Sequence, residues 1–299
     1  MAAYRYESQN YLMPEGLRYR IAAPISTTMP TQGVRNMPFN FRFIAAAMLL
    51  ALSPALALAV TPWDGTWQIK PGSYKTTGKP DKYLLINGQY TCGICNPSFT
   101  IKADGNDQPI TGSAYADTVA VKVVDAHTVD QVSKQKGKLL VKMRRTVSAD
   151  GKSMVTEATN YMGAKEAHFS NTSVRTAAGA PGSHAISGEW QASTTNDISD
   201  AGRTMGIEST AKGMRMSWNG TVADAEFGGP AVMQTNDPGH AMVALKKLDA
   251  HTIEETDTIK GKVSDVIRYQ LSADGKTIAV VDEDKLHEQR TDYLMEKPH

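Results

Sequence analysis

An internal repeat constrains the fold of this chain more than any other feature of its sequence. Residues 125–128 (DAHT) recur 124 positions later at 249–252, and residues 148–152 (SADGK) recur at the same spacing at 272–276. Across positions 125–152, 13 of 28 residues are identical to those 124 positions further on. Self-similarity at a fixed spacing indicates two copies of one structural unit. The sequence therefore predicts a tandem duplication of a unit of about 115 residues.

Each unit has the residue pattern of antiparallel β-structure. Val119, Val121 and Val123 alternate with Ala120 and Lys122, and period-two alternation is typical of strands with one buried face. Asp-Gly steps at 104–105, 150–151 and 274–275 are typical of tight turns. A meander of short strands tends to close on itself, because closure removes unpaired edges. We expect an all-β fold of two tandem antiparallel barrel units.

The repeat sets the predicted domain boundaries. The first unit spans 60–176, a linker rich in Ala, Gly and Pro spans 177–183, and the second unit spans 184–299. Upstream, residues 37–59 combine Arg42, an apolar run and an Ala-x-Ala end, which predicts a signal peptide that is cleaved before Val60. The polar, aperiodic residues 1–36 are predicted to be a non-native or disordered extension. The alternative is an uncleaved membrane anchor, since the apolar segment 43–60 reaches 18 residues.

Charge and compartment limit the partners. The chain carries 32 Lys and Arg against 31 Asp and Glu, a balance that argues against a nucleic-acid-binding surface. Cleavage of the signal peptide predicts a periplasmic or secreted protein with no stable membrane insertion. The sequence indicates no oligomeric state.

The two cysteines, Cys92 and Cys95, are the most distinctive local feature. In an oxidising compartment they are predicted to form a disulfide that pins a short loop. A redox role is the less favoured alternative, since reactive Cys-x-x-Cys pairs sit at helix N-termini and this pair follows a predicted strand. A metal site would need more ligands than the pair provides. We predict no metal and no cofactor.

Several segments resemble a known group of proteins. Gly65–Thr66–Trp67 and Gly188–Glu189–Trp190 resemble the entry strand of lipocalins, in which a Trp plugs one end of the barrel. Together with residues 101–105 (IKADG), 117–129 and 253–265, the repeated segments resemble uncharacterised exported bacterial proteins with tandem lipocalin-like repeats. The resemblance implies a lipocalin-like fold and export, and it implies no catalytic residues.

The first functional hypothesis is binding of a small apolar, amphipathic or aromatic molecule inside a barrel. The candidate lining residues are large and apolar: Trp67, Trp190, Met214, Met216 and Trp218. The alternative for these residues is a filled core, which is common in small barrels.

The second hypothesis is a cofactor-independent lyase, isomerase or hydrolase acting on a small hydrophobic or aromatic substrate. The candidate catalytic residues are Tyr90, Tyr161, Glu255, Arg268 and Tyr269. A third hypothesis is an envelope interaction protein that meets its partner through sheet edges or the 92–95 loop. The sequence alone does not distinguish an enzyme from a binding protein.

The remaining polar residues favour structural roles. His127 and His251 recur in the repeat and are expected in turns. Arg144 and Arg268 are expected on the outer faces of equivalent strands, although in a lumen they would pair with an anionic ligand. The acidic clusters at 254–257 and 282–284 are expected on a solvated edge, with acid–base chemistry or cation binding as the alternative.

Overall fold

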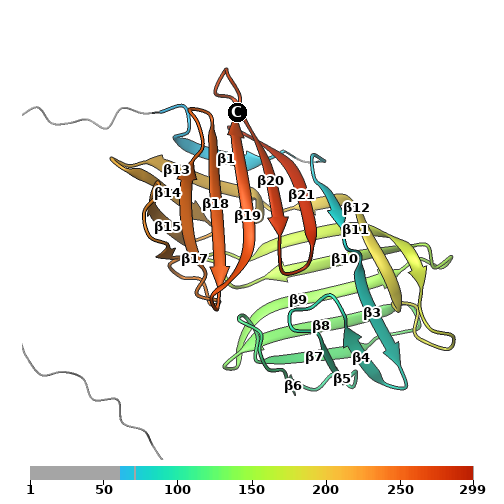
Figure 1. The fold of residues 1–299 in the computed structure, drawn as a ribbon. Coiled ribbons are helices and arrows are strands. Elements are labelled where there is room, and N and C mark those ends of the chain that lie inside the picture. The colour runs from blue at the N-terminus through green and yellow to red at the C-terminus, as the bar shows by residue number, and fades with distance from the viewer. Residues whose placement is uncertain (1–60, 71, 299) are drawn as a thin grey trace, which may run out of the picture. The chain divides into compact units, whose positions relative to one another are not determined.

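The computed structural model describes residues 61–70 and 72–298, and within them the chain is almost entirely β (Figure 1). The predicted signal peptide (37–59) and the upstream extension (1–36) lie outside the described residues. Strands β1–β21 and one short helix, α1 (Asp200–Arg203), make up the regular structure of the described part. No helix in that part has the length and hydropathy needed to cross a membrane.

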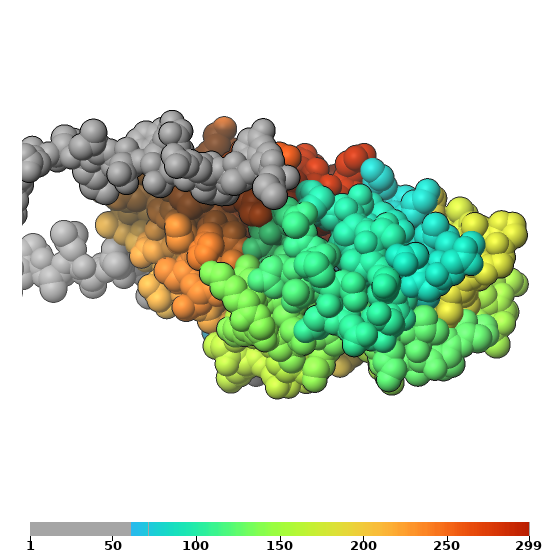
Figure 2. Space-filling view, turned by 90° about the horizontal axis from the view of Figure 1, so that it is seen from below, coloured from blue at the N-terminus to red at the C-terminus, as the bar shows by residue number. Residues whose placement is uncertain are grey.

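The first sheet is built from one continuous stretch of chain, and we call it the contiguous barrel. Its strands are β3 (Asp81–Ile86), β4 (Gln89–Cys92), β5 (Phe99–Lys102), β6 (Gln108–Pro109), β7 (Thr118–Val123), β8 (Thr128–Gln135), β9 (Lys138–Val147), β10 (Ser153–Asn160), β11 (Ala167–Ala178) and β12 (Gly188–Ile198). They are hydrogen-bonded in the order β5-β4-β3-β12-β11-β10-β9-β8-β7-β6. A bridge between Asp104 and Lys122 brings the ends of the sheet together. Figure 2 shows part of its outer surface in teal, green and yellow.

The second sheet takes strands from both ends of the described chain, and we call it the split barrel. Its strands are β1 (Gly65–Ile69), β2 (Lys75–Gly78), β13 (Thr204–Ser209), β14 (Gly213–Trp218), β15 (Thr221–Glu226), β16 (Val232–Met233), β17 (Met242–Lys247), β18 (Thr252–Ile259), β19 (Lys262–Leu271), β20 (Thr277–Asp284) and β21 (Gln289–Glu296). The order is β15-β14-β13-β1-β21-β20-β19-β18-β17-β16, and β2 pairs with β21. Bridges Val222–Thr235 and Phe227–Leu245 nearly close it. The predicted all-β fold with two antiparallel barrel units is confirmed.

The two barrels exchange their first strands. β1 opens the first sequence repeat, yet it pairs with β13 and β21 of the split barrel. β12 occupies the same place in the second repeat and pairs with β11 and β3 of the contiguous barrel. The pairing registers are equivalent, since Trp67 lies opposite Met205 and Trp190 lies opposite Asp81. The predicted linker 177–183 therefore joins two strands of one sheet, and the barrels do not follow the sequence repeats.

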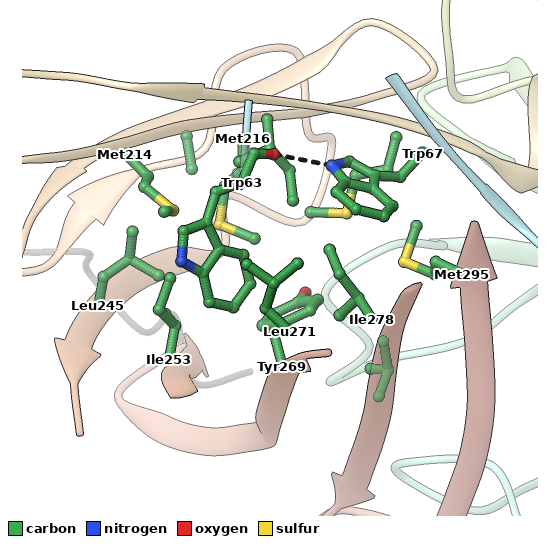
Figure 3. Packing of buried hydrophobic residues seen from close by; sticks show 14 of the residues in the cluster. Trp63, Trp67, Met214, Met216, Leu245, Ile253, Tyr269, Leu271, Ile278 and Met295 are labelled. Carbon is green, nitrogen blue, oxygen red and sulfur yellow. Dashed lines mark hydrogen bonds between the residues drawn. The ribbon is translucent and has the colours of Figure 1, made fainter. Parts of the chain in front are cut away.

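Each exchanged strand brings a Trp into the core of the other repeat's barrel. Trp67 is fully buried in the split-barrel core, among Trp63, Ile278 and Met295 (Figure 3). Its indole Nε1 donates to the Trp63 carbonyl at 2.8 Å, and Trp190 Nε1 donates to the Ile186 carbonyl at 2.9 Å. The buried indole N–H groups are thus satisfied, which removes the main penalty of burying Trp.

The repeated sequence motifs are turns. Asp150 Oδ1 accepts from the Lys152 amide at 3.0 Å, and Asp274 Oδ1 accepts from the Lys276 amide at 3.1 Å. In the DAHT segments, the Asp125 and Asp249 carboxylates accept from the amides two residues on. Such carboxylate-capped turns fix the hairpin geometry locally, and this explains why these residues recur in both repeats.

Candidate functional site

A cavity of about 580 Å³ with mostly apolar walls opens into the contiguous barrel, and residues of the split barrel complete its lining; we call it the apolar cup. Its walls include Phe99, Ile110, Val119, Leu140 and Met143. Along β8 the inward residues alternate with outward ones, whereas on β9 a register shift breaks the alternation and both Leu140 and Val141 line the cavity. The alternation along β8 also places two polar side chains, of Gln131 and Ser133, on the lining.

The mouth of the apolar cup is basic. The basic lining residues Lys260, Lys262 and His287 all come from the split barrel. The Lys260 ammonium donates to the carbonyls of Gly112 and Ser113 at 3.0 and 2.9 Å. A hydrogen bond with Asp284 raises the pKa of His287, whose Nδ1 lies 2.5 Å from that carboxylate. Among the described residues, no Asp or Glu lines this cup.

A buried cation lies next to the lining of the apolar cup. Arg145 is only 6% exposed, and its Nη1 donates to Gln131 Oε1 at 3.1 Å. Its guanidinium carbon stands 4.6 Å from the ring centroid of Tyr83, a cation–π geometry. The Tyr90 hydroxyl donates to the same Gln131 oxygen at 3.5 Å, and burial raises the pKa of Tyr90. The charges that act on Arg145 come from the hydroxyls of Tyr83 and Tyr90 and from the carboxylate of Asp81.

The split barrel contains a second cavity of about 390 Å³, which we call the acidic cup. Aromatic side chains form part of its wall, with Tyr74 and Tyr293 stacked at 5.0 Å between ring centroids and Trp218 also on the lining. Its charged residues are three carboxylates: Glu255, Asp257 and Asp282. No Lys, Arg or His of the described residues lines it.

Burial dominates the ionisation of these carboxylates. It raises the pKa of Glu255, whose Oε2 accepts a hydrogen bond of 2.9 Å from the Tyr269 hydroxyl. Burial and the charge of Glu255 raise the pKa of Asp257 to about 9. Burial and the charge of Asp265 raise the pKa of Asp282 to about 7. At neutral pH the acidic cup therefore holds protons that exposed carboxyls would have lost.

The two cups carry different groups at equivalent positions of the repeat. The polar lining residues of the acidic cup are Glu255, Asp257 and Asp282, and 124 positions earlier stand Gln131, Ser133 and Ala158. The partner of Glu255 is Tyr269, and the equivalent partner of Gln131 is Arg145. The duplicated barrel has thus become acidic in one copy and neutral to basic in the other.

The structure separates the predicted lining residues into two groups. Met216 and Trp218 line the acidic cup. Trp67, Trp190 and Met214 are buried in the two cores and line neither cup. The filled-core alternative therefore describes these three residues.

The structure brings two of the predicted catalytic residues together, Glu255 and Tyr269, on neighbouring strands of the acidic cup. Tyr90 lies in the core of the contiguous barrel. Tyr161 lies beneath the Lys142 ammonium, 5.7 Å from the ring centroid.

The paired arginines face outward. Arg268 is half exposed and pairs with Glu254 at 2.8 Å, and Arg144 pairs with Asp130 at 2.7 Å on the equivalent strands. Arg268 is therefore outside the cup that contains Glu255, and the outward-facing interpretation describes both arginines.

The expectation of a solvated acidic edge is wrong for Glu255, Asp257 and Asp282. These residues point into the split barrel, because they are in phase with the buried residues Ile253 and Val280. A shift of one residue along a strand moves a side chain to the other face.

Two residues near the apolar cup, Gln131 and Arg145, were not predicted from the sequence. They are in phase with the buried residues Val129 and Val147, so the same rule would have identified them.

The predicted disulfide between Cys92 and Cys95 is confirmed, and Cys95 borders the apolar cup. In the described part of the chain, no three His, Cys, Asp or Glu side chains are placed to hold a metal ion. Comparison of the chain with protein-family models, with curated proteins and with solved structures gave no match.

Proposed function

We propose that this protein binds a small amphipathic molecule, with an apolar or aromatic body, in the apolar cup. The observation that carries the proposal is the cavity itself: about 580 Å³ with mainly apolar walls and a few polar groups. Ligand pockets typically have about 300–1,000 Å³ and this kind of lining. A filled barrel would have no such space.

The charges around the apolar cup favour a neutral or anionic polar group on the ligand. Lys260 and Lys262 of the split barrel stand at the mouth, and Arg145 lies behind Gln131 on the inside. A carboxylate or sulfonate at either place would meet positive charge and no acidic lining residue among those described. An amine would gain nothing there.

Export to the periplasm or the outside of the cell is part of the proposal. It rests on the signal-peptide pattern of residues 37–59 and on the resemblance to exported lipocalin-like proteins. The Cys92–Cys95 disulfide is consistent with an oxidising compartment.

Native mass spectrometry of the protein from Val60 onward, purified from the periplasm of its source, tests the proposal. We expect an added mass that disappears on denaturation. Ser133→Trp, which fills the apolar cup, should abolish the added mass, whereas Val132→Trp on the outer face of the same strand should preserve it. An unchanged adduct in the folded Ser133→Trp protein would contradict the proposal.

A second candidate function is cofactor-independent catalysis in the acidic cup. The observation that favours it is the Glu255–Tyr269 hydrogen bond inside a cavity, since burial raises the pKa of both groups. A carboxyl of raised pKa can exchange protons with a substrate near neutral pH. If a screen of small aromatic substrates finds turnover, Glu255→Gln should abolish it while near-ultraviolet circular dichroism stays unchanged. Turnover that survives this change would exclude the role.

A further inference from the structure

The acidic cup collects three carboxyl groups with no basic side chain of the described protein beside them. Glu255 is only 7% exposed, yet its hydrogen-bond donors are neutral groups, the Tyr269 hydroxyl and the Asp257 carboxyl. By contrast the outward-facing Glu254, one residue earlier, pairs with Arg268. Buried carboxylates are usually paired with a cation, because desolvation penalises an isolated charge.

Two carboxylate oxygens of the acidic cup have no hydrogen-bond partner in the described chain. They are Asp257 Oδ1 and Asp282 Oδ1, and both atoms are buried. Unsatisfied buried acceptors are rare in folded proteins and each one is unfavourable. A bound molecule that carries hydrogen-bond donors or positive charge would remove this penalty.

The remaining wall of the acidic cup is aromatic. Tyr74 and Tyr293 stack on one another, and Trp218 lies on the same lining. The face of an aromatic ring carries negative potential and attracts an alkylated ammonium, which is weakly hydrated. Aromatic faces beside carboxylates form the usual recognition surface for organic cations. A hard metal ion instead needs several converging oxygen ligands, and the described residues contain no such group.

We propose that the acidic cup is a binding site for an organic cation: an ammonium group bearing apolar or aromatic substituents. The cation lies against Tyr74, Tyr293 and Trp218. Its positive charge lowers the pKa of Asp257 and Asp282, so these carboxyls release their protons on binding and balance its charge. The proposal concerns the split barrel and does not depend on the function proposed for the apolar cup. The protein then carries two binding sites of opposite charge preference, derived from one duplicated barrel.

Titration with benzyltrimethylammonium at pH 8, followed by Trp fluorescence and by calorimetry, tests the proposal. Two related probes are the controls, the neutral benzyl alcohol and the anionic benzenesulfonate. We expect the ammonium probe to bind at least about tenfold more tightly than either control. Equal affinity for the three probes, or preference for benzenesulfonate, would overturn the proposal. Displacement of the ammonium probe by an equal concentration of Ca²⁺ would also overturn it, because it would assign the acidic cup to a metal.

The repeat supplies a variant that is expected to fold. Asp257→Ser combined with Asp282→Ala introduces the residues that the contiguous barrel carries at the equivalent positions, Ser133 and Ala158. We expect this variant to lose at least about tenfold in affinity for benzyltrimethylammonium. The control, Glu254→Gln, removes a carboxylate from the outer face of β18 and should leave the affinity unchanged. Equal losses in the two variants would mean that general electrostatics attracts the probe, and the proposal would fail.

Discussion

At the scale of single residues, the buried carboxyls of the acidic cup lower the free energy of unfolding. The groups that face Asp257 and Asp282 add negative charge or burial: Glu255 from β18, Asp265 from β19, Asp284 from β20 and Tyr293 from β21. The basic groups nearby, such as His287, act mainly on Asp265 and Asp284. Such clusters are retained where function needs them, because neutral residues of similar size would be more stable.

This cluster predicts a dependence of stability on pH. Burial raises the pKa of Asp257 from 3.8 to about 9 in the folded state, so the unfolded chain loses its proton first as pH rises. The free energy of unfolding should therefore be highest near pH 4 and should fall as pH rises towards 9. Asp257→Asn with Asp282→Asn should flatten this fall and stabilise the protein at pH 8.5 by about 1–2 kcal/mol.

Urea unfolding of the protein and of the Asn variant at pH 5 and pH 8.5 measures this effect. Asp224→Asn is the control, since Asp224 is exposed on β15, outside the acidic cup. If the pH dependence stays the same in the double Asn variant, Asp257 and Asp282 are not the groups responsible for it.

At the scale of elements, the turns and strands follow from local sequence. The Asp-Gly turns at 150–151 and 274–275 place Gly151 and Gly275 at φ of 71° and 68°, a region that disfavours side chains. The alternating valines of β7 form a strand, with Val119 and Val121 buried. These features could be predicted because they depend on neighbours along the chain. The inward face of β18 was predicted wrongly, because Glu255 and Asp257 are polar, although their phase with the buried Ile253 places them inside the barrel.

Ala substitutions at Gly151 and Gly213 distinguish the cost of backbone strain from the cost of a steric clash. A Cβ at Gly151 would meet no atom within 4 Å, so Gly151→Ala should lower the free energy of unfolding by only about 1 kcal/mol, through its positive φ. A Cβ at Gly213 would collide with the Ala225 carbonyl oxygen of the neighbouring strand β15. Gly213→Ala should therefore lower the free energy of unfolding by more than about 2 kcal/mol. Chemical denaturation of both variants checks the order, and a larger loss in Gly151→Ala would contradict the turn geometry.

At the scale of the whole molecule, the exchange of first strands decides which part of the chain is a folding unit. The contiguous barrel needs only residues 81–198, from β3 to β12. The split barrel needs β1 and β2 together with β13–β21. A sequence repeat cut at the linker would lose its pairing partner for β3 or β13, and with it Trp190 or Trp67 from the core.

A fragment of residues 80–199 should therefore fold by itself as a monomer. The fragment of residues 60–176, which corresponds to the first repeat, should fail to fold or should associate, because β12 is absent and one side of β3 and β11 stays unpaired. Near-ultraviolet circular dichroism and analytical ultracentrifugation of the two fragments distinguish these outcomes. A monomeric, folded 60–176 fragment would show that β1 can return to its own repeat.

Short-range order along the chain was sufficient to predict two β units, their turns, and a disulfide across a three-residue separation. The sequence also predicted the duplication, because identity at a fixed spacing needs no knowledge of contacts. The barrel that each first strand completes depends on long-range contacts, and the sequence did not predict it. Both barrels offer an edge with the same register, so local sequence does not distinguish them. The character of the cups likewise depends on long-range contacts, because charge collects inside a barrel only when distant strands bring their inward faces together.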